Sequence, residues 1–361
     1  MQNGVATAPT HIADLTPEWL EAALRPRFAH LKVKDVSLGP PVQGTATKIR
    51  LNAEYENAPS DLPNTLIVKA GFADHREAMA YLYAHEARFY RDIQPQLNIN
   101  TPSCFATIDD FSLHQHIVIM EDLTLSDTRF CRVEHPLTYA EAKGFLDILA
   151  RLHARTWNKP IIGADGRQAE LQIWEALPAV DNGGTYAHGQ LVPEVWAHYM
   201  SLPRCLAVPR LFHDCDRIRT GLEALNVLCR QEPHCLLHAD FHLGNLYFDG
   251  KGRQGVLDWQ SYSLGHWSHD VTYFIVSALD PVDRRRWDHA LVSYYLAQLR
   301  AEGLANPPSL DEAMQGFRLQ ILDGLFYWMV NPPNWQSEEN NCSVAPRFAH
   351  AAMDYRSFEA F

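Results

Sequence analysis

This sequence of 361 residues lacks the basic surface chemistry of a nucleic-acid-binding protein. It contains no run of lysine or arginine longer than three residues, and its formal net charge is −12. The phosphate backbone of DNA or RNA attracts basic surfaces, so this balance argues against nucleic acid as a partner. A small-molecule ligand is the better expectation.

Paired cysteines and long apolar runs are also missing. The seven cysteines are scattered without the CxxC pairing of structural zinc sites, so we expect reduced, mostly buried thiols. No stretch approaches the roughly 18 uninterrupted apolar residues of a membrane span, and the N-terminus lacks the basic and apolar segments of a secretory signal. We therefore predict a cytoplasmic protein without a membrane partner. The sequence contains no internal repeat and does not indicate an oligomeric state.

What the sequence does contain is typical of a folded protein with two lobes. Hydrophobic residues make up 47% of the chain and aromatic residues 11%, which is far above the content of disordered chains. The chain is too long for one ordinary core and long enough for two.

Strand-like segments dominate the first third of the chain. Alternating apolar residues bounded by turn-rich sequence predict antiparallel strands at residues 31–39, 47–55, 64–72, 103–108 and 115–120. A helix is expected before them, with Thr16 as its N-cap and Pro17 at its first position. We place the boundary between the lobes after residue 122.

A second helix is predicted over residues 74–93, where Met79, Leu82, Phe89 and Ile93 recur along one face. Glu86 lies on the same apolar face. A buried carboxylate is unfavourable unless a cation or hydrogen bonds satisfy it. Lys69, at the end of an apolar strand, is its natural partner.

Helical patterns dominate the rest of the chain. Two stretches rich in Gly, Pro, Asp or Asn, residues 158–190 and 331–346, are predicted to be long loops that are either functional or flexible. The predicted helices cover residues 139–157, 193–200, 215–229 and 283–302.

The segment from residue 234 to residue 270 carries the chemistry. It predicts a hairpin with Asp240 and Asn245 before it and Asp258 after its second strand. Phosphoryl transfer from ATP needs oxygen ligands for Mg²⁺, a carboxylate near the attacking hydroxyl and a cation on the phosphates. The order and spacing of these three residues match a kinase catalytic loop and metal-binding aspartate.

This segment resembles the aminoglycoside phosphotransferase and choline kinase superfamily, whose loop reads H-G-D-x-H-x-x-N and whose metal strand ends in D-W-E. The corresponding residues here are His238–Asn245 and Leu257–Gln260. Ile119–Leu123 is similar to the hinge, and His269–Phe274 to the helix that braces the catalytic loop. Among the branches of this superfamily, the chain looks closest to the bacterial relatives of ecdysteroid-kinase-like proteins.

The resemblance implies an α+β, two-lobed protein-kinase-like fold that uses ATP and Mg²⁺. Residues 1–122 would form the nucleotide-binding lobe, with a small antiparallel sheet and a helix. Residues 123–361 would form the larger, mainly helical lobe with the catalytic loop and the acceptor site.

The resemblance also implies roles for single residues in phosphoryl transfer. Asp240 would be the catalytic base, Asn245 and Asp258 would hold Mg²⁺, and Asp270 would anchor the loop backbone. Lys69, held by Glu86 as the burial argument also indicates, would contact the ATP phosphates.

Nucleotide contacts are expected from two further places. Gly44 and Thr45 would belong to a flap over the phosphates, with backbone N–H groups and hydroxyls as donors. Backbone groups of Glu121 and Leu123 would meet adenine, and Met120 would line the back of that pocket.

Two positions depart from the family pattern. Ala239 stands where the loop usually has glycine, which adds a methyl group where the backbone is tight. Gln260 replaces an acid that frequently follows Asp-Trp. Neither change removes a metal ligand or the base, so we expect activity to survive.

The leading hypothesis is an ATP-dependent O-phosphotransferase acting on a hydroxyl group of a small hydrophobic molecule. An antibiotic kinase, acting on an aminoglycoside or macrolide, and a nucleotide-binding pseudoenzyme are the alternatives. The alternation of His238, Asp240 and His242 also allows a zinc hydrolase, although that leaves Asn245 and Asp258 without a role.

Aromatic residues of the helical lobe have two possible roles, in an acceptor pocket or in core packing. His153 and the other scattered histidines are expected to be hydrogen-bonded structural residues. The tryptophans considered for the pocket are Trp157, Trp174, Trp196, Trp267, Trp328 and Trp335.

Overall fold

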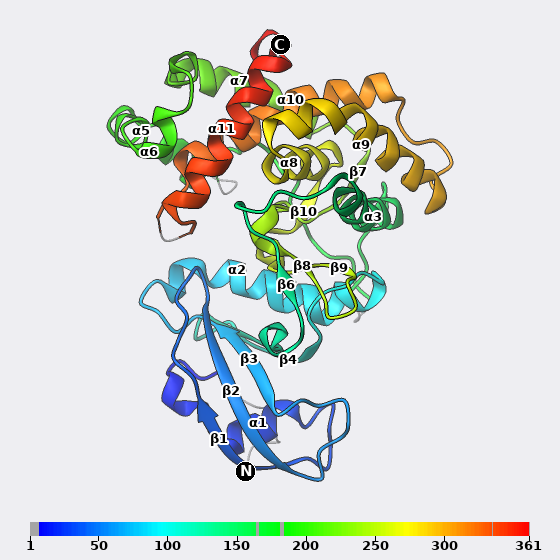
Figure 1. Ribbon diagram of the computed structural model, residues 1–361. Helices are drawn as coiled ribbons and strands as arrows, with labels where there is room; N and C mark the ends of the chain where they lie inside the picture. The colour runs from blue at the N-terminus through cyan, green and yellow to red at the C-terminus, as the bar shows by residue number, and fades with distance from the viewer. Residues whose placement is uncertain (1–6, 164–165, 181–183, 334, 361) are drawn as a thin grey trace. The chain divides into compact units, whose positions relative to one another are not determined.

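The computed structural model describes residues 7–163, 166–180, 184–333 and 335–360. These residues form two compact units (Figure 1). The first unit consists of the chain up to Arg129 and the segments Ile162–Arg167 and Asp249–Ser261. The second unit consists of the remaining residues. One unit is built on an antiparallel sheet and the other is mainly helical, which confirms the predicted α+β fold class.

The chain does not divide at a single point after residue 122, as the predicted boundary assumed. Asp249–Ser261 returns to the first unit, because Asp258 pairs there with Lys69 and the ring of Trp259 stacks on Phe89. The assignment of nucleotide and acceptor binding to separate lobes stays a prediction.

The sheet of the first unit has five strands in the order β1-β2-β3-β5-β4, with every neighbouring pair antiparallel. All five strands were predicted. The last hairpin is inserted so that β5, and not β4, pairs with β3. The strands are β1 (Lys32–Leu38), β2 (Thr47–Glu56), β3 (Thr65–Ala70), β4 (Cys104–Asp110) and β5 (Gln115–Glu121).

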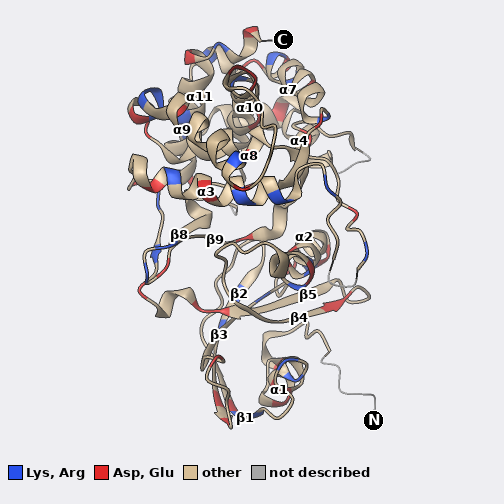
Figure 2. Cartoon of the chain, turned by 90° about the vertical axis from the view of Figure 1, so that its right-hand side faces the viewer, with Lys and Arg blue, Asp and Glu red and all other residues tan. Residues whose placement is uncertain are grey.

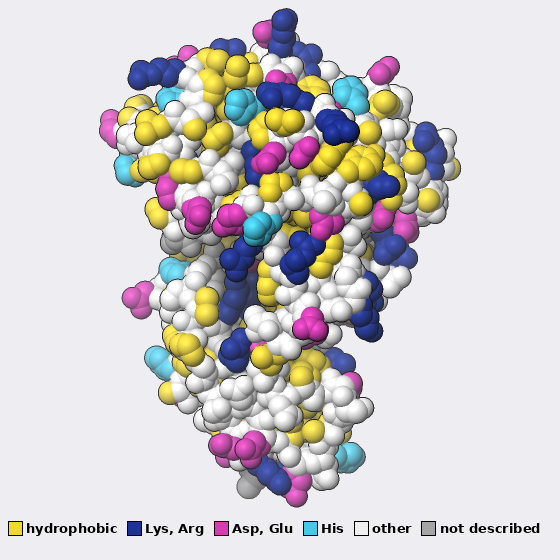
Figure 3. Space-filling model, viewed as in Figure 1, with side chains coloured by type: hydrophobic (Ala, Val, Ile, Leu, Met, Phe, Trp, Pro, Cys, Tyr) yellow, Lys and Arg dark blue, Asp and Glu magenta, His cyan; other side chains and the backbone are white. Residues whose placement is uncertain are grey.

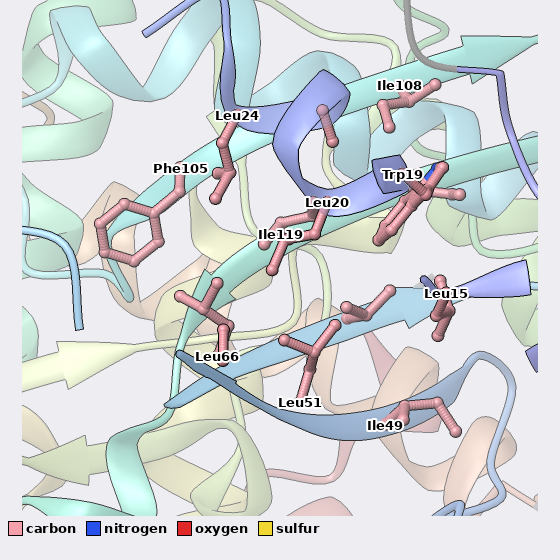
Figure 4. Packing of buried hydrophobic residues seen from close by; sticks show 14 of the residues in the cluster. Leu15, Trp19, Leu20, Leu24, Ile49, Leu51, Leu66, Phe105, Ile108 and Ile119 are labelled. Atoms are coloured by element: carbon pink, nitrogen blue, oxygen red, sulfur yellow. The ribbon is translucent and has the colours of Figure 1, made fainter. Parts of the chain in front are cut away.

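One face of this sheet packs against the first helix, α1 (Pro17–Leu24). The predicted cap is present, since the side chain of Thr16 accepts a hydrogen bond from the backbone N–H of Trp19 at 3.2 Å. Leu20 and Leu24 are fully buried in a cluster with side chains of β2, β3 and β5 (Figure 4). Each such side chain contributes about 1.5–3 kcal/mol through its removal from water.

The second helix, α2 (Arg76–Arg88), continues into a π-helical turn at Phe89–Ile93 (η2). Its most buried helical positions are Ala80, Tyr83, Glu86 and Ala87, whereas the predicted Met79 and Leu82 are only half-buried. The helix was thus predicted correctly, but its buried face is rotated toward small alanine side chains, which allow close packing on β5. Glu86 remains on the buried face.

The second unit is built around helices, with one antiparallel strand pair formed by β7 (His234–Leu237) and β10 (Ser263–His266). Acidic and basic side chains are interspersed over its helices (Figures 2 and 3). Its helices are α3 (Tyr139–Thr156), α4 (Thr185–Gln190), α5 (Pro193–Met200), α6 (Pro203–Leu206), α7 (Cys215–Cys229), α8 (Ser268–Ala278), α9 (Pro281–Ala301), α10 (Leu310–Val330) and α11 (Glu338–Asp354). Of the remaining short strands, β8 (Leu246–Phe248) belongs to this unit, β9 (Gln254–Val256) belongs to the first unit, and β6 (Arg129–Phe130) lies where the chain passes from the first unit to the second.

The four predicted helices of this unit are present, but both loop predictions were wrong in part. Most of residues 331–346 belong to α11, which begins at Glu338 after the cap formed by Ser337 and contains Pro346 within it. Tertiary packing overrides the loop-like local sequence here, because Val344 and Phe348 are fully buried. The other predicted loop, residues 158–190, is wrong at its end, where Thr185–Gln190 form α4. Its residues 164–165 and 181–183 lie outside the described residues.

Within the described ranges, no helix has both the length and the apolar character required to cross a bilayer.

Candidate active site

Lys69 and Glu86 form the expected buried ion pair in the first unit. Lys69 lies near the end of β3, between β2 and β5, and is only 5% exposed. Its Nζ donates to Glu86 Oε1 at 2.8 Å and to Asp258 Oδ1 at 3.0 Å. Burial alone would lower the pKa of this ammonium group, but the Asp258 and Glu86 carboxylates outweigh it and raise the pKa. The amine therefore keeps its positive charge, as a phosphate-binding group requires.

Asp258, the second carboxylate that contacts Lys69, is fixed by contacts of the residues before and after it in the chain. Two residues before it, the Val256 N–H donates to the Asn100 carbonyl oxygen at 3.0 Å. One residue after it, the Trp259 ring stacks on Phe89 with centroids 3.9 Å apart. Asp258 itself has φ of +65°, a left-handed conformation that aspartate tolerates better than most residues. The sequence predicted that Asp258 follows a strand, but not that it contacts Lys69.

The predicted flap is tied to α2. The Thr45 carbonyl oxygen accepts from the Tyr83 hydroxyl at 2.6 Å and lies 3.0 Å from His75 Nε2. These two contacts hold the flap backbone next to Gly44 against the start and the middle of α2. Sequence analysis missed Tyr83, and the only signal for it was an aromatic residue three positions before Glu86.

The predicted hinge is ordered by a buried carboxylate. Asp122 accepts from the Thr124 N–H at 3.0 Å and from Arg50 Nε at 2.6 Å. Met120 and Leu123 are buried beside it. The backbone N–H of Glu121 donates to the Ser103 carbonyl oxygen at 2.9 Å, so this N–H is already occupied and does not serve a ligand.

In the second unit, Asp270 anchors the loop that follows β7. Its side chain is fully buried and accepts from the backbone N–H groups of His238 at 2.7 Å and Ala239 at 3.0 Å. Burial alone would raise the pKa of this carboxyl group, but hydrogen bonds from His153 and His269 lower it below its ordinary value. Asp270 is therefore an ionised acceptor for the loop backbone, as the resemblance implied.

Asp240 and Asn245 lie together in this loop. A short 3₁₀ turn, Leu243–Asn245, brings the Asn245 side chain back to Asp240. Its Nδ2 donates to the Asp240 carbonyl oxygen at 2.9 Å and to Asp240 Oδ2 at 3.0 Å. His242 Nε2 lies 3.5 Å from Asp240 Oδ1. The Asp240 side chain is still 34% exposed, so it is positioned and yet accessible.

The donor set at these positions fits Mg²⁺ in kind. Because Asn245 uses its amide nitrogen toward Asp240, Oδ1 is the atom that it can offer to a cation. Asp258 supplies a carboxylate, and Mg²⁺ prefers such hard oxygen ligands. Among the described residues, no three His, Cys, Asp or Glu side chains are grouped to hold a metal ion. The zinc-hydrolase hypothesis therefore has no ligand cluster there to support it.

The sequence matches a known protein family over most of its length. A profile of the phosphotransferase enzyme family matches residues 66–312, which is more than half of the chain. The chain belongs to the phosphotransferase enzyme family. This match confirms the resemblance to the aminoglycoside phosphotransferase and choline kinase superfamily and the expectation of an enzyme. The ecdysteroid-kinase-like branch stays a prediction.

Several solved structures are similar to this phosphotransferase at low sequence identity. A microcompartment-associated aminopropanol kinase is 18% identical over 92% of this chain and 95% of its own, with a TM-score of 0.48. An ethanolamine kinase from Plasmodium vivax is 14% identical over 90% and 83%, with a TM-score of 0.48. The macrolide 2'-phosphotransferase MphH from Brachybacterium faecium is 15% identical over 89% and 96%, with a TM-score of 0.48. No curated protein sequence matches the chain.

The phosphotransferase departs from its family pattern at two positions with different structural consequences. Ala239 has φ of +65°, where an alanine is strained and glycine is not, which explains why glycine is usual there. The Gln260 side-chain oxygen is buried and has no hydrogen-bond partner among the described residues.

The tryptophans of the second unit divide into two groups. Trp196, Trp267 and Trp328 are buried core residues, whereas the remaining three of the six are half-buried. Two of these belong to a chain of ring contacts, which we call the aromatic surface and which sequence analysis identified only in part. Its members, all half-buried, are Trp174, Tyr186, Tyr327 and Trp335.

The aromatic surface is connected to the catalytic loop. Gln336, next to Trp335, lies with Nε2 3.4 Å from His242 Nε2, and His242 is the neighbour of Asp240. Two carboxylates close to this surface are already paired with cations. Asp323 pairs with His269 at 3.1 Å, and Glu338 pairs with Arg204 at 3.0 Å.

Proposed function

We propose that this phosphotransferase transfers the γ-phosphoryl group of ATP, with Mg²⁺, to a hydroxyl group of a small hydrophobic molecule. The observation that carries the proposal is the buried amine of Lys69, held by Glu86 and Asp258. A structural ion pair gains little from burial, because desolvation of the charges offsets their attraction. A phosphate-binding role for this amine explains why a charged group is kept at a buried position.

In this reaction the acceptor oxygen forms a bond to the γ-phosphorus while the bond from that phosphorus to the leaving oxygen of ADP breaks. Asp240 accepts the hydroxyl proton, and its bonds to Asn245 orient it for that task. Asn245 and Asp258 would hold Mg²⁺, which neutralises the charge on the phosphates. Lys69 offsets the remaining charge on the nucleotide.

Nucleotide contacts are proposed for the flap and the hinge. Gly44 and Thr45 would cover the phosphates. The Glu121 carbonyl oxygen and the Leu123 backbone would meet adenine, with Met120 behind the ring. Anchoring of Thr45 by Tyr83 supports the flap assignment, because a covering loop must be held close enough to donate to phosphate oxygens.

The aromatic surface supports a neutral, hydrophobic acceptor. Exposed ring faces bind flat apolar groups through burial and stacking. A polycationic aminoglycoside would instead need carboxylates without partners. Asp323 and Glu338, which lie close to it, are each paired with a cation, so the surface is better suited to an uncharged molecule.

The proposed activity is tested with Mg²⁺, ATP and a panel of alcohols, sterols, hydroxy acids and antibiotics, with ³¹P NMR to detect a phosphate monoester and an assay of ADP release. We expect transfer to a neutral acceptor, and a loss of roughly 100-fold or more in Asp240→Asn. The matched control is Asp216→Asn, at an exposed position in the first turn of α7. Absence of both ATP consumption and nucleotide binding would sink the proposal, and equal activity of wild type and Asp240→Asn would favour a pseudoenzyme.

The acceptor surface is tested with the compound that the panel identifies. Trp335→Leu should raise the KM for that acceptor about 10-fold while the KM for ATP stays the same, because only the acceptor loses a ring contact. Trp287→Leu is the control, since Trp287 is a half-buried tryptophan on α9 that packs on Tyr139. An unchanged acceptor KM in Trp335→Leu would remove the aromatic surface from the proposal.

A further inference from the structure

A buried chain of hydrogen bonds runs from the aromatic surface to the catalytic loop. Trp174 Nε1 donates to Asp323 Oδ1 at 3.3 Å, and His269 Nε2 lies 3.1 Å from Asp323 Oδ2. The other nitrogen of the same ring, His269 Nδ1, lies 3.2 Å from Asp270 Oδ1. Asp270 in turn accepts the loop N–H groups of His238 and Ala239. Every link lies within the second unit.

The protonation state of His269 follows from this arrangement. A carboxylate oxygen accepts hydrogen bonds, so a histidine with a carboxylate at each ring nitrogen satisfies both contacts only when both nitrogens carry a proton. Burial disfavours that cation, but the hydrogen bonds to Asp270 and Asp323 raise the pKa of His269 to about 9. The group thus consists of an imidazolium between two buried carboxylates.

Three other titratable groups lie around His269 and its two carboxylate partners. On α3, His153 Nε2 lies 3.4 Å from Asp270 Oδ2 and its other nitrogen lies 2.8 Å from the Tyr295 hydroxyl. Tyr273 on α8 stacks on His269, and burial raises its pKa well above the ordinary value, so it is neutral. Burial likewise raises the pKa of Cys229 on α7, near Asp323, to about 12.

We propose that Asp323 is a positioning residue for phosphoryl transfer: it keeps His269 doubly protonated, and through His269 and Asp270 it fixes the loop backbone that carries Asp240. The proposal rests on the proposed role of Asp240 as the base. Neither Asp323 nor His269 is assigned a contact with ATP or with the acceptor.

The loop needs such support because of its backbone. Ala239, immediately before Asp240, is held at φ of +65°, a backbone conformation that strains an alanine. The hydrogen bond from its N–H to Asp270 offsets this strain. If Asp270 loses its charged partner, the carboxylate has less reason to stay at this position, and Asp240 is free to move. A misplacement of about 1 Å can cost roughly 100-fold in rate.

The decisive variant is Asp323→Asn. An asparagine can still accept from Trp174 through its oxygen, and its amide nitrogen can donate to a neutral His269. The fold is therefore retained while the cation is lost. We expect kcat to fall roughly 10- to 100-fold near neutral pH, with the KM for ATP unchanged.

The pH profile separates positioning from simple loss of structure. In the wild type, His269 loses its proton as pH rises through 9, whereas in Asp323→Asn it is neutral throughout that range. The ratio of wild-type to variant kcat should therefore shrink toward one at high pH. Hydrogen exchange at the His238 and Ala239 amides, measured without any substrate, should be faster in the variant.

Asp288→Asn is the matched control, because Asp288 is a buried carboxylate on α9 that accepts hydrogen bonds from Arg284 and Tyr355 instead. It should lower stability but leave the pH profile parallel to that of the wild type. A kcat ratio that does not change with pH, or unchanged amide exchange in Asp323→Asn, would overturn the proposal. Failure of the proposed function is a different result, a wild-type protein that transfers no phosphate, and the exchange experiment remains decisive in that case.

Discussion

Removal of the Lys69 amine by Lys69→Met is the most direct test of the buried ion pair. Methionine has a similar length, so the change removes the charge and largely keeps the packing. The amine contacts Glu86, which is 3% exposed, and Asp258, whose side chain is 18% exposed. Loss of one partner from a buried pair costs about 3–5 kcal/mol, because the remaining charge has been taken out of water without compensation. We expect the free energy of unfolding to fall by about that amount at roughly pH 8.

A double variant separates the effect of the buried charge on stability from the effect of packing. Lys69→Met combined with Glu86→Gln no longer leaves an ionised group at the more deeply buried position, so its stability deficit should shrink to about 1–2 kcal/mol. Lys34→Met is the matched control. Lys34 is an exposed lysine on β1, and its loss should change stability by no more than about 0.5 kcal/mol.

The loss of stability in Lys69→Met should depend on pH, because it arises from the charge of Glu86. Burial raises the pKa of Glu86, and without Lys69 the largest opposing interaction is gone. A folded-state pKa above the unfolded value means that the folded variant binds the proton more tightly, so its stability recovers as pH falls toward about 4.5 and is lost as pH rises. The deficit should therefore be smaller at about pH 5 than at about pH 8.

Urea unfolding followed by tryptophan fluorescence measures these free energies, and calorimetric titration with ADP and Mg²⁺ measures nucleotide affinity. We expect Lys69→Met to lose activity by roughly 100-fold or more, since it removes a donor to the phosphates. A Lys69→Met protein within about 1 kcal/mol of wild type, or a deficit that is equal at both pH values, would refute the reasoning.

Three further predictions concern the loop, the flap and the buried histidine. Ala239→Gly should leave stability within about 1 kcal/mol of wild type, whereas Ala239→Val should lower it by about 2 kcal/mol, because a β-branched residue tolerates positive φ poorly; urea unfolding of the two variants decides this. Tyr83→Phe removes the hydroxyl that donates to Thr45 and should raise the KM for ATP about 5-fold, an effect of about 1 kcal/mol that initial-rate kinetics will detect or exclude. The carboxylates beside His269 outweigh burial and raise its pKa to about 9. The protonated ring therefore contributes about 3 kcal/mol to the free energy of unfolding below about pH 6.5, and this contribution is lost as pH rises through 9. The free energy of unfolding of His269→Gln, measured across that range, should not show this decline.

Local patterns in the sequence determined much of the fold. The five strands, the first two helices and four helices of the second unit follow from alternation, helical periodicity and caps such as Thr16. The spacing from Asp240 to Asn245 and Asp258 indicated the chemistry, because a 3₁₀ turn of fixed length returns Asn245 to Asp240. The misplaced charge of Glu86 on an apolar face was enough to predict its pairing with Lys69.

Only the tertiary structure decided which distant residues meet. The return of Asp258 to the first unit, the anchoring of the flap by Tyr83 and the link from Asp323 to the catalytic loop each join side chains that are far apart in the chain. The start of α11 at Glu338 was decided by packing of its later residues, against the preference of a sequence rich in proline and asparagine. Periodicity and spacing describe what a segment does with its own neighbours, whereas burial and hydrogen bonding between segments depend on how the folded elements pack.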